Sequence, residues 1–261
     1  MNSKISAWEI VENARSKSRA QSIDYIRNIF TDFMELKGDR IDSDDKTILG
    51  GLAMFENIPV TIIAFRKGKN LDENIKYNYG MAKPSGYRKA LRLAKQAEKF
   101  KRPIIIFVDT PGAFPGVESE IKGQAEAIAK CLLDFSDLNI KIISIIISEA
   151  CSGGALALCV SDRVIMLENS YFSILSPEGY ASILWRNKNV KKAASMMELT
   201  SKDLLEKGII DQIVKEENTT YGTSMNISAL LKKEISDSVP NDLIKKRYEK
   251  LRFIDHRKKY E

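Results

Sequence analysis

The sequence lacks the features of a membrane or exported protein. No apolar run approaches the roughly 18–20 residues of a membrane-spanning helix. The longest runs, Ile104–Val108 and Ile142–Ile147, have the length of buried strands. Residues 1–20 are polar and contain no hydrophobic signal-peptide region. We therefore predict a cytoplasmic protein with no membrane segment.

Metal-binding and hydrolase signatures are also missing. The three cysteines are Cys131, Cys151 and Cys159. They form no CxxC pair, which argues against disulfides and against a zinc site built by this chain alone. A Ser152–Asp211–His256 triad would have the chain order of an α/β-hydrolase. However, Ala150 stands where the nucleophile turn needs glycine, so we interpret His256, the single histidine, as a surface residue.

Nucleotide-binding loops and strong charge clustering are absent as well. There is no GxxxxGK[ST] and no GxGxxG after a predicted strand. The net charge of +6 is spread along the chain and is dense only near the C-terminus, so it is weak support for nucleic-acid binding. Of the 261 residues, 44% are hydrophobic and 29% charged, the balance of a soluble globular protein with a large core.

The hydrophobic patterns that are present predict an α/β protein. Residues 1–36 read as helical, and a hairpin follows, with strands Ile48–Phe55 and Val60–Arg66 joined by Glu56 and Asn57. A helix over 84–100, a strand over 104–109, a helix over 120–135 and a strand over 141–148 come next. They form βαβ units with parallel strands. Beyond them we expect strands over 163–167 and 171–175, helices over 178–185, 190–197 and 201–207, a loose segment over 216–228, and a helical C-terminus.

Two glycine-rich loops follow the two central strands. The first is PGAFPG, residues 111–116, and the second is the turn EACSGG, residues 149–154. Ligands gather at the carboxyl ends of parallel strands, and free N–H groups at a helix start favour negative charge. The two loops could form an oxyanion hole. The alternative is that these glycines only make tight turns.

Several long runs resemble one family closely. They are GDR (38–40), DDKTILGG (44–51), NYGMAKPSGYRKALRLAKQAEKF (78–100), RPIIIFVDTPGAFPG (102–116), SGGALAL (152–158) and MLENSYFSILSPEGYASILW (166–185). Together they resemble the alpha subunit of bacterial acetyl-CoA carboxylase carboxyltransferase, in its short form without a longer N-terminal extension. The likeness spans residue 7 to about 214.

This resemblance implies a fold, a domain division and partners. The fold is of the crotonase type, a spiral of ββα units with flanking N- and C-terminal helices. The division is an N-terminal helical segment (1–36), a carboxyltransferase core (37–215) and a C-terminal helical assembly segment (216–261). The implied assembly is an α2β2 heterotetramer whose beta subunit carries zinc. A biotin carboxyl carrier protein and a biotin carboxylase complete the holoenzyme.

The resemblance also implies the reaction. Carboxybiotin on the carrier protein would supply CO2, and the anionic ureido group would take a proton from the methyl of acetyl-CoA, giving malonyl-CoA for fatty acid synthesis. Gly153 and Gly154 would form the oxyanion hole for the ureido oxygen. Further binding residues are Gly112, Phe114, Gly116, Ser152, Ala155, Tyr79, Gly80 and Met81. No metal is expected in this chain. The basic face of helix 84–100 is interpreted as solvated, with a contact to CoA phosphates as the alternative.

The sequence departs from the family pattern beside the glycine pair. The family reads EGGSGGA, whereas Ala150 and Cys151 stand here in place of two glycines. If either position needs a positive φ, its Cβ costs about 1 kcal/mol. We expect both to have negative φ, and we expect a branched side chain at Gly154 to block the ureido oxygen without disturbing assembly.

Two other functions remain open at this point. One is a stand-alone crotonase-type hydratase or isomerase acting on an acyl-CoA, with Glu118 and Glu120 as its carboxylates. The other is a diverged, non-catalytic scaffold subunit that still pairs with a beta chain. The long matched runs favour the carboxyltransferase, active only with the beta subunit.

Overall fold

The computed structural model describes residues 5–186, 189–236, 242–252 and 254. An eight-stranded sheet runs in the order β1-β2-β3-β4-β5-β6-β8, and β7 pairs with β5. The strands are β1 Thr31–Glu35, β2 Ile48–Phe55, β3 Ile58–Phe65, β4 Ile104–Thr110, β5 Ile142–Cys151, β6 Arg163–Leu167, β7 Tyr171–Ser173 and β8 Gln212–Val214. Within these residues, no helix has the length and apolar character needed to cross a membrane.

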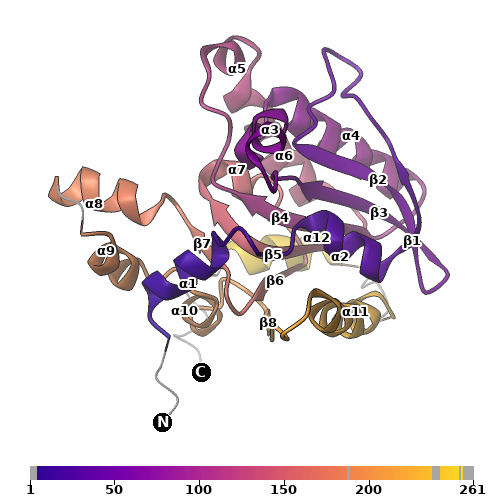
Figure 1. Cartoon of the computed structure of the whole chain (residues 1–261). Coiled ribbons are helices and arrows are strands. Elements are labelled where there is room, and N and C mark those ends of the chain that lie inside the picture. The colour runs from indigo at the N-terminus through magenta and orange to yellow at the C-terminus, as the bar shows by residue number, and fades with distance from the viewer. Residues whose placement is uncertain (1–4, 187–188, 237–241, 253, 255–261) are drawn as a thin grey trace.

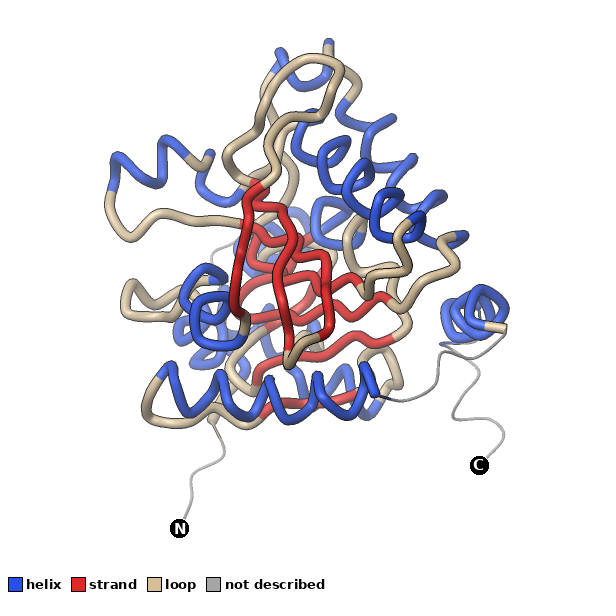
Figure 2. The backbone as a smooth tube through the Cα atoms, turned by 90° about the vertical axis from the view of Figure 1, so that its right-hand side faces the viewer, coloured by secondary structure: helices blue, strands red, loops and turns tan. Residues whose placement is uncertain are grey.

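Helices lie on both faces of this sheet (Figures 1 and 2). They are α1 Ala7–Ala14, α2 Ser22–Ile29, α3 Leu71–Lys76, α4 Pro84–Lys99, α5 Val117–Ile121, α6 Gln124–Asp137, α7 Ser152–Leu156, α8 Pro177–Trp185, α9 Val190–Met197, α10 Ser201–Glu206, α11 Thr220–Ser236 and α12 Leu243–Arg252. A 3₁₀ turn spans Asn78–Gly80. Helices α8 and α9 extend away from the sheet (Figure 1).

The alternation of side chains along the central strands creates two cores. Ile104 and Ile106 of β4 point to the face covered by α4 and α6, whereas Ile105 and Phe107 point to the face covered by α2 and α11. A strand buried on both faces reads as a continuous apolar run, which is why β4 and β5 could be recognised in the sequence.

The predicted hairpin is confirmed. β2 and β3 pair antiparallel from Ile48↔Phe65 to Phe55↔Ile58. The two turn residues, Glu56 and Asn57, both have positive φ, of 43° and 69°. This pair of left-handed residues matches the twist of a two-residue hairpin. From β3 onward every neighbouring pair through β8 is parallel, as the βαβ pattern predicted.

The helical prediction for residues 1–36 is wrong at its end. Residues 31–35 form β1, which pairs antiparallel with β2. Phe33 lies at helical spacing from Ile29 and Ile26, and this spacing suggested one continuous helix. Phe30 instead turns the chain into the extended region, with φ −117° and ψ 151°. The edge of β2 then offers backbone hydrogen bonds that outweigh the helical preference of this short segment.

Two other segments differ from expectation. The helix predicted over 120–135 is divided into α5 and α6 by Gly123, which has φ 81°. The segment predicted to be loose, 216–228, contains the first half of α11. Apolar residues of α11, such as Ile227 and Leu231, are buried against the sheet. Tertiary packing therefore stabilises a helix whose N-terminal half is polar.

The basic face of α4 is solvated only in part: Lys95 and Lys99 are exposed, whereas Arg88 and Lys89 form ion pairs. Arg88 pairs with Asp39 at 2.7 Å, and Lys89, only 1% exposed, pairs with Asp44 at 2.6 Å. Burial raises the pKa of Asp39, but hydrogen bonds from backbone N–H groups and from Arg88 outweigh this effect and lower the pKa to about 2. These cations hold the loop before β2 against the helix, so their role is structural.

A buried arginine on helix α12 makes the most extensive polar contact between this helix and the core, and Lys250 adds an ion pair with Asp211. Arg247 donates to the carbonyls of Phe135, Leu138 and Ile140 at 2.7–2.9 Å and forms an ion pair with Asp162. The three carbonyls lie in the last turn of α6 and in the segment after it, where carbonyl groups have no partner within the helix. The guanidinium satisfies them and fixes α12 in place.

Candidate functional site

The two glycine-rich loops meet at the carboxyl ends of β4 and β5. Gly154 is buried, and a Cβ built on it would lie 2.4 Å from the nitrogen of Ala113 and 2.7 Å from the carbonyl carbon of Gly112. Only glycine permits this approach. The absence of a side chain at Gly154 therefore sets the distance between the loops, and a branched residue there would displace the PGAFPG loop as well as block a ligand.

The turn after β5 begins three residues later than the sequence suggested, at Ser152 instead of Glu149. Strand β5 continues through Ala150 and Cys151, and Cys151 has φ −123° and ψ 139°. Neither residue has a positive φ, as predicted. The left-handed residue is Ser152, with φ 61°. It turns the chain directly into α7, which aligns the first N–H groups of that helix.

Gly153 lies on the open side of this turn. A Cβ built there would have only Ile128 Cγ2 within contact range, at 3.8 Å. Ser152 is exposed and Gly153 half-buried, whereas Ala155 is fully buried in the core. Of the predicted residues on α7, Ser152 and Gly153 are thus open to solvent, and Ala155 supports the turn from below.

Ala113 is a functional candidate that sequence reasoning missed. The N–H of Gly112 is bonded to Thr110 Oγ1 at 3.1 Å, and that of Phe114 donates to the carbonyl of Ala82 at 3.1 Å. The N–H of Ala113, between them, donates to no acceptor among the described residues. It is adjacent to Gly154. Nothing in PGAFPG indicates which N–H is left unbonded, since this depends on the bonds of its neighbours.

The other predicted residues lie beside these loops. Ala82 forms a parallel bridge with Ala113, so the segment containing Tyr79, Gly80 and Met81 runs next to the PGAFPG loop. Phe114 is half-buried beneath the ammonium of Lys83, 5.2 Å from the ring centre. Gly116 caps α5, further from α7 along the same loop, and contacts the Phe114 ring.

An apolar cavity of about 570 Å³ opens beside Ser152 and Gly153. Its apolar walls include Leu156, Phe172, Ile174, Leu175, Tyr180 and Met196. Ile174 is 82% exposed, and Ile183 and Leu184 on α8 are also exposed. Apolar surface of this extent on an extended helical arm is typical of a surface that contacts another molecule.

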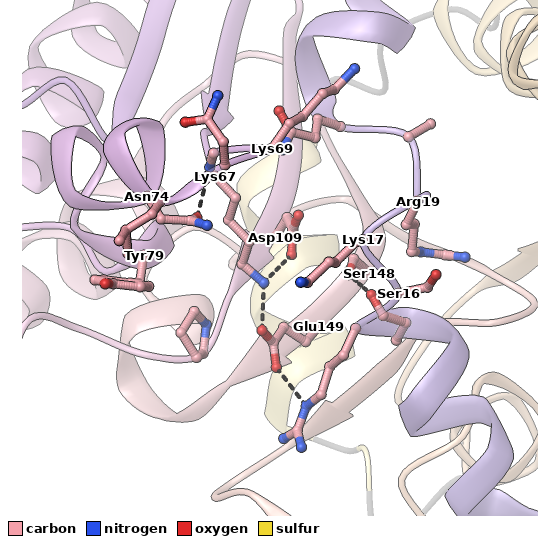
Figure 3. Close-up of a pocket in the computed structure, with 18 residues that line it drawn as sticks. Ser16, Lys17, Arg19, Lys67, Lys69, Asn74, Tyr79, Asp109, Ser148 and Glu149 are labelled. Carbon is pink, nitrogen blue, oxygen red and sulfur yellow. Dashed lines mark hydrogen bonds and ion pairs between the residues drawn. The ribbon is translucent and has the colours of Figure 1, made fainter.

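A second cavity, of about 470 Å³, lies next to the same strand ends and is highly charged (Figure 3). At its floor Lys67 pairs with both Asp109 and Glu149. Burial raises the pKa of Glu149, but Lys67 and the hydroxyl of Tyr171 lower it to about 2. Burial lowers the pKa of Lys67, and the two carboxylates raise it above its ordinary value. Glu149 and Lys67 are therefore both ionised at neutral pH.

The hydrolase triad finds no support in the described part of the chain. Asp211 accepts a hydrogen bond from the N–H of Val164 at 2.7 Å and pairs with Lys250, so it is held as a structural group. His256 lies outside the described residues. No group of three metal-ligating side chains occurs in residues 5–186, 189–236, 242–252 and 254. Glu118 and Glu120 lie exposed on α5.

Comparison with known proteins identifies the family. Residues 1–255 match the family described as acetyl co-enzyme A carboxylase carboxyltransferase-like. The alpha subunit of the acetyl-coenzyme A carboxylase carboxyl transferase of Clostridium botulinum is 54% identical over 258 residues, covering 95% of this chain and 94% of the relative. The corresponding subunit of Clostridium beijerinckii is 51% identical over 261 residues, covering 97% and 96%.

A third relative differs in length. The Clostridium tetani protein named as subunits beta/alpha is 49% identical over 263 residues, which cover 97% of this chain and 46% of that protein.

Solved structures show the same fold at low sequence identity. The transcarboxylase 12S, with methylmalonyl-coenzyme A bound, superposes with a TM-score of 0.70 at 20% identity, covering 90% of this chain and 45% of that one. The beta subunit of the Pseudomonas aeruginosa geranyl-CoA carboxylase gives 0.67 at 14% identity, covering 94% and 45%. This chain thus spans about half the length of these two proteins.

The crotonase-type α/β fold predicted from the sequence is confirmed by this similarity and by the mostly parallel sheet with its flanking helices. The relatives support the carboxyltransferase prediction and neither the hydratase nor the scaffold alternative. The chain belongs to the acetyl co-enzyme A carboxylase carboxyltransferase family and, within it, to the alpha subunits, with the carboxyltransferase activity of that family.

Proposed function

We propose that this chain forms the carboxybiotin half of an acetyl-CoA carboxyltransferase. Together with a beta subunit it would transfer the carboxyl group from carboxybiotin, carried on a biotin carboxyl carrier protein, to acetyl-CoA. The observation that carries this proposal is the contact of the two loops, which places the unbonded N–H of Ala113 beside the start of α7.

The donors are suited to an oxygen that becomes negative. The N–H groups of Gly153 and Gly154 belong to the first turn of α7, where no intrahelical acceptor exists. With Ala113 they would hold the ureido oxygen of biotin as charge develops on it. Removing one such donor from an oxyanion hole lowers kcat by about 10²–10³-fold in other enzymes. The open space beside Gly153 gives the ureido ring an approach.

The described residues offer no free base beside these donors. Among the described residues lining the apolar cavity, the ionisable groups are Tyr180, Glu198 and Lys207, and the last two pair with each other. Cys151 is buried, and burial raises the pKa of its thiol. Biotin, once decarboxylated, supplies the basic group for proton removal. This chain would then contribute position and electrostatic stabilisation.

The apolar surface of α8 and the cavity beside it would contact the beta subunit. A beta/alpha chain exists in Clostridium tetani, which supports a stable association of the two types of subunit. We propose an α2β2 heterotetramer with zinc in the beta subunit only. The biotin carboxylase and the carrier protein would complete the holoenzyme in the cytoplasm.

The test is biotin-dependent decarboxylation of malonyl-CoA, the reverse reaction, by the chain assembled with a beta subunit. We expect acetyl-CoA to form only when biotin or biocytin is added. Decarboxylation at the same rate without biotin would refute the assignment of this half to carboxybiotin.

A further inference from the structure

Lys67 makes a contact that the reaction described above does not use. It follows β3, and its ammonium lies between two carboxylates, 2.7 Å from Asp109 Oδ1 and in direct contact with Glu149 Oε1. Its side chain is 18% exposed. Figure 3 shows Lys67 reaching from one wall of the charged cavity to both acids. Each acid comes from a different strand, Asp109 from β4 and Glu149 from β5.

These two strands lose their regular pairing at this level. Val108 is paired with Ile146, but the next pair is Thr110 with Ala150, so two residues of β4 correspond to four of β5. An irregularity of this kind interrupts the ladder of hydrogen bonds. The hydrogen bonds of the sheet therefore do not fix the relative position of the ends of β4 and β5. Both donor loops begin at these ends.

The surroundings of Lys67 hold it in this bridging position. The Asn78–Gly80 turn has three successive positive φ angles, of 48°, 54° and 82°. A Cβ on Gly80 would lie 2.8 Å from Cγ and 2.9 Å from Cε of Lys67, so the lysine stem packs directly on this glycine. Unfavourable backbone conformations persist where the surrounding structure requires them. Here they form the wall along which Lys67 extends.

Glu149 is held from its other side. Its Oε2 accepts hydrogen bonds from the hydroxyl of Tyr171 at 2.6 Å and from Nε of Arg15 at 3.2 Å. Both Glu149 oxygens are thus occupied, and the carboxylate cannot swing away without losing charged partners in a buried place. The link from Lys67 to β5 is therefore rigid.

We propose that Lys67 is a positioning residue for carboxyl transfer, a proposal that rests on the function proposed above. By tying Asp109 to Glu149 it sets the spacing of the two loops that carry the Ala113 donor and the Gly153 and Gly154 donors. A shift of about 1 Å in such donors is enough to lower a rate about 100-fold. Lys67 itself touches neither reacting group.

The test uses the chain assembled with its beta subunit. Lys67→Met keeps the length of the side chain and removes the bridge. We expect kcat for biotin-dependent malonyl-CoA decarboxylation to fall about 100-fold, with KM for malonyl-CoA changed less than about threefold, because the affected loops do not hold that substrate. Lys67→Arg, which can contact both acids, should retain activity within about tenfold of the unmodified complex.

Lys69→Met is the matched control. Lys69 lines the same cavity but is exposed and pairs with Asp24. The Lys69→Met variant removes the same charge from the cavity without changing a contact to either strand end. Its kcat should therefore equal that of the unmodified complex. An equal loss of kcat in both variants would mean that the cavity binds a ligand through its charge, and would overturn the positioning role.

Asp109→Asn combined with Lys67→Met separates positioning from stability. Lys67→Met leaves Asp109 without its cation, whereas Glu149 keeps Arg15. The neutral pair therefore relieves the unpaired buried carboxylate and should recover thermal stability while kcat stays low. Recovery of kcat together with stability would overturn the proposal, because Lys67 would then act only on folding. If Lys67→Met alone does not assemble, this double variant and Asp109→Asn, expected to lower kcat about tenfold or more, decide the question. Failure of the unmodified complex to require biotin would refute the proposed function instead.

Discussion

Replacing Gly154 by alanine tests the contact between the two loops. A Cβ at this position would lie 2.4 Å from Ala113 N and 2.8 Å from the hydroxyl of Tyr87, which donates a hydrogen bond to the Gly154 carbonyl at 3.1 Å. Ordinary contacts begin near 3.4 Å. The Gly112–Ala113 peptide must therefore move by about 1 Å, a displacement that can lower a rate about 100-fold.

That loss corresponds to about 2.7 kcal/mol in the activation free energy. Overpacking should also lower the free energy of unfolding by about 1–3 kcal/mol. Gly153→Ala is the comparison, since its Cβ meets only Ile128 at 3.8 Å. It should leave thermal stability unchanged or raise it by up to about 1 kcal/mol, because glycine is unfavourable in a helix.

The assay for both variants is biotin-dependent malonyl-CoA decarboxylation in complex with the beta subunit, together with thermal unfolding. If Gly154→Ala retained more than a tenth of the activity, the spacing of Gly112, Ala113 and Gly154 would not control the donors. The oxyanion hole would then lie elsewhere.

Other variants test neighbouring parts of the account. Ala150→Gly with Cys151→Gly should lower stability by about 0.4–1 kcal/mol per site without raising the transfer rate, since both residues are already extended; a large rate increase would contradict this. Arg247→Met should lower the free energy of unfolding in urea by about 3–5 kcal/mol, because it leaves Asp162 and three carbonyls buried without their partner; a loss below about 1 kcal/mol would show that α12 is held otherwise. The pKa of Glu149 is depressed from 4.5 to about 2, so its stabilisation is complete above about pH 4.5 and is lost as the pH falls toward 2. Glu149→Gln should therefore be less stable at pH 7 and show a flatter pH dependence in that window, and an unchanged acid-unfolding curve would refute the ion-pair network.

The elements that the sequence predicted well are those in which local pattern and tertiary packing agree. Helix α4 begins at Pro84, which is pre-organised for a helix start, and its apolar residues share one face. The β2–β3 hairpin joins two largely buried apolar strands by a turn whose two residues have positive φ. Where the two levels disagree, prediction failed: β1 exists because β2 offers a free edge, and α11 exists because Ile227 and Leu231 are buried on the sheet.

The sequence predicted the site only where the residue type alone indicates the chemistry. Gly153 and Gly154 were recognised as a pair, but only the structure separates the open Gly153 from the buried Gly154. Lys67 lies in a polar stretch, FRKGKN, in which two lysines look equivalent. Their roles differ because Lys67 extends along Gly80 toward Asp109 and Glu149, at the ends of two strands. These acids lie 42 (109 − 67) and 82 (149 − 67) residues further along the chain. No local pattern in the sequence indicates that Lys67 contacts both of these acids.

The central claim is that this chain is one half of a carboxyltransferase site. The most direct measurement titrates a fixed amount of the purified chain with a beta subunit while following biotin-dependent malonyl-CoA decarboxylation. We predict no activity from either subunit alone and a rate that rises to a plateau at one beta subunit per chain. Turnover by the isolated chain at a rate near that of the mixture would contradict the account and support a self-sufficient acyl-CoA enzyme.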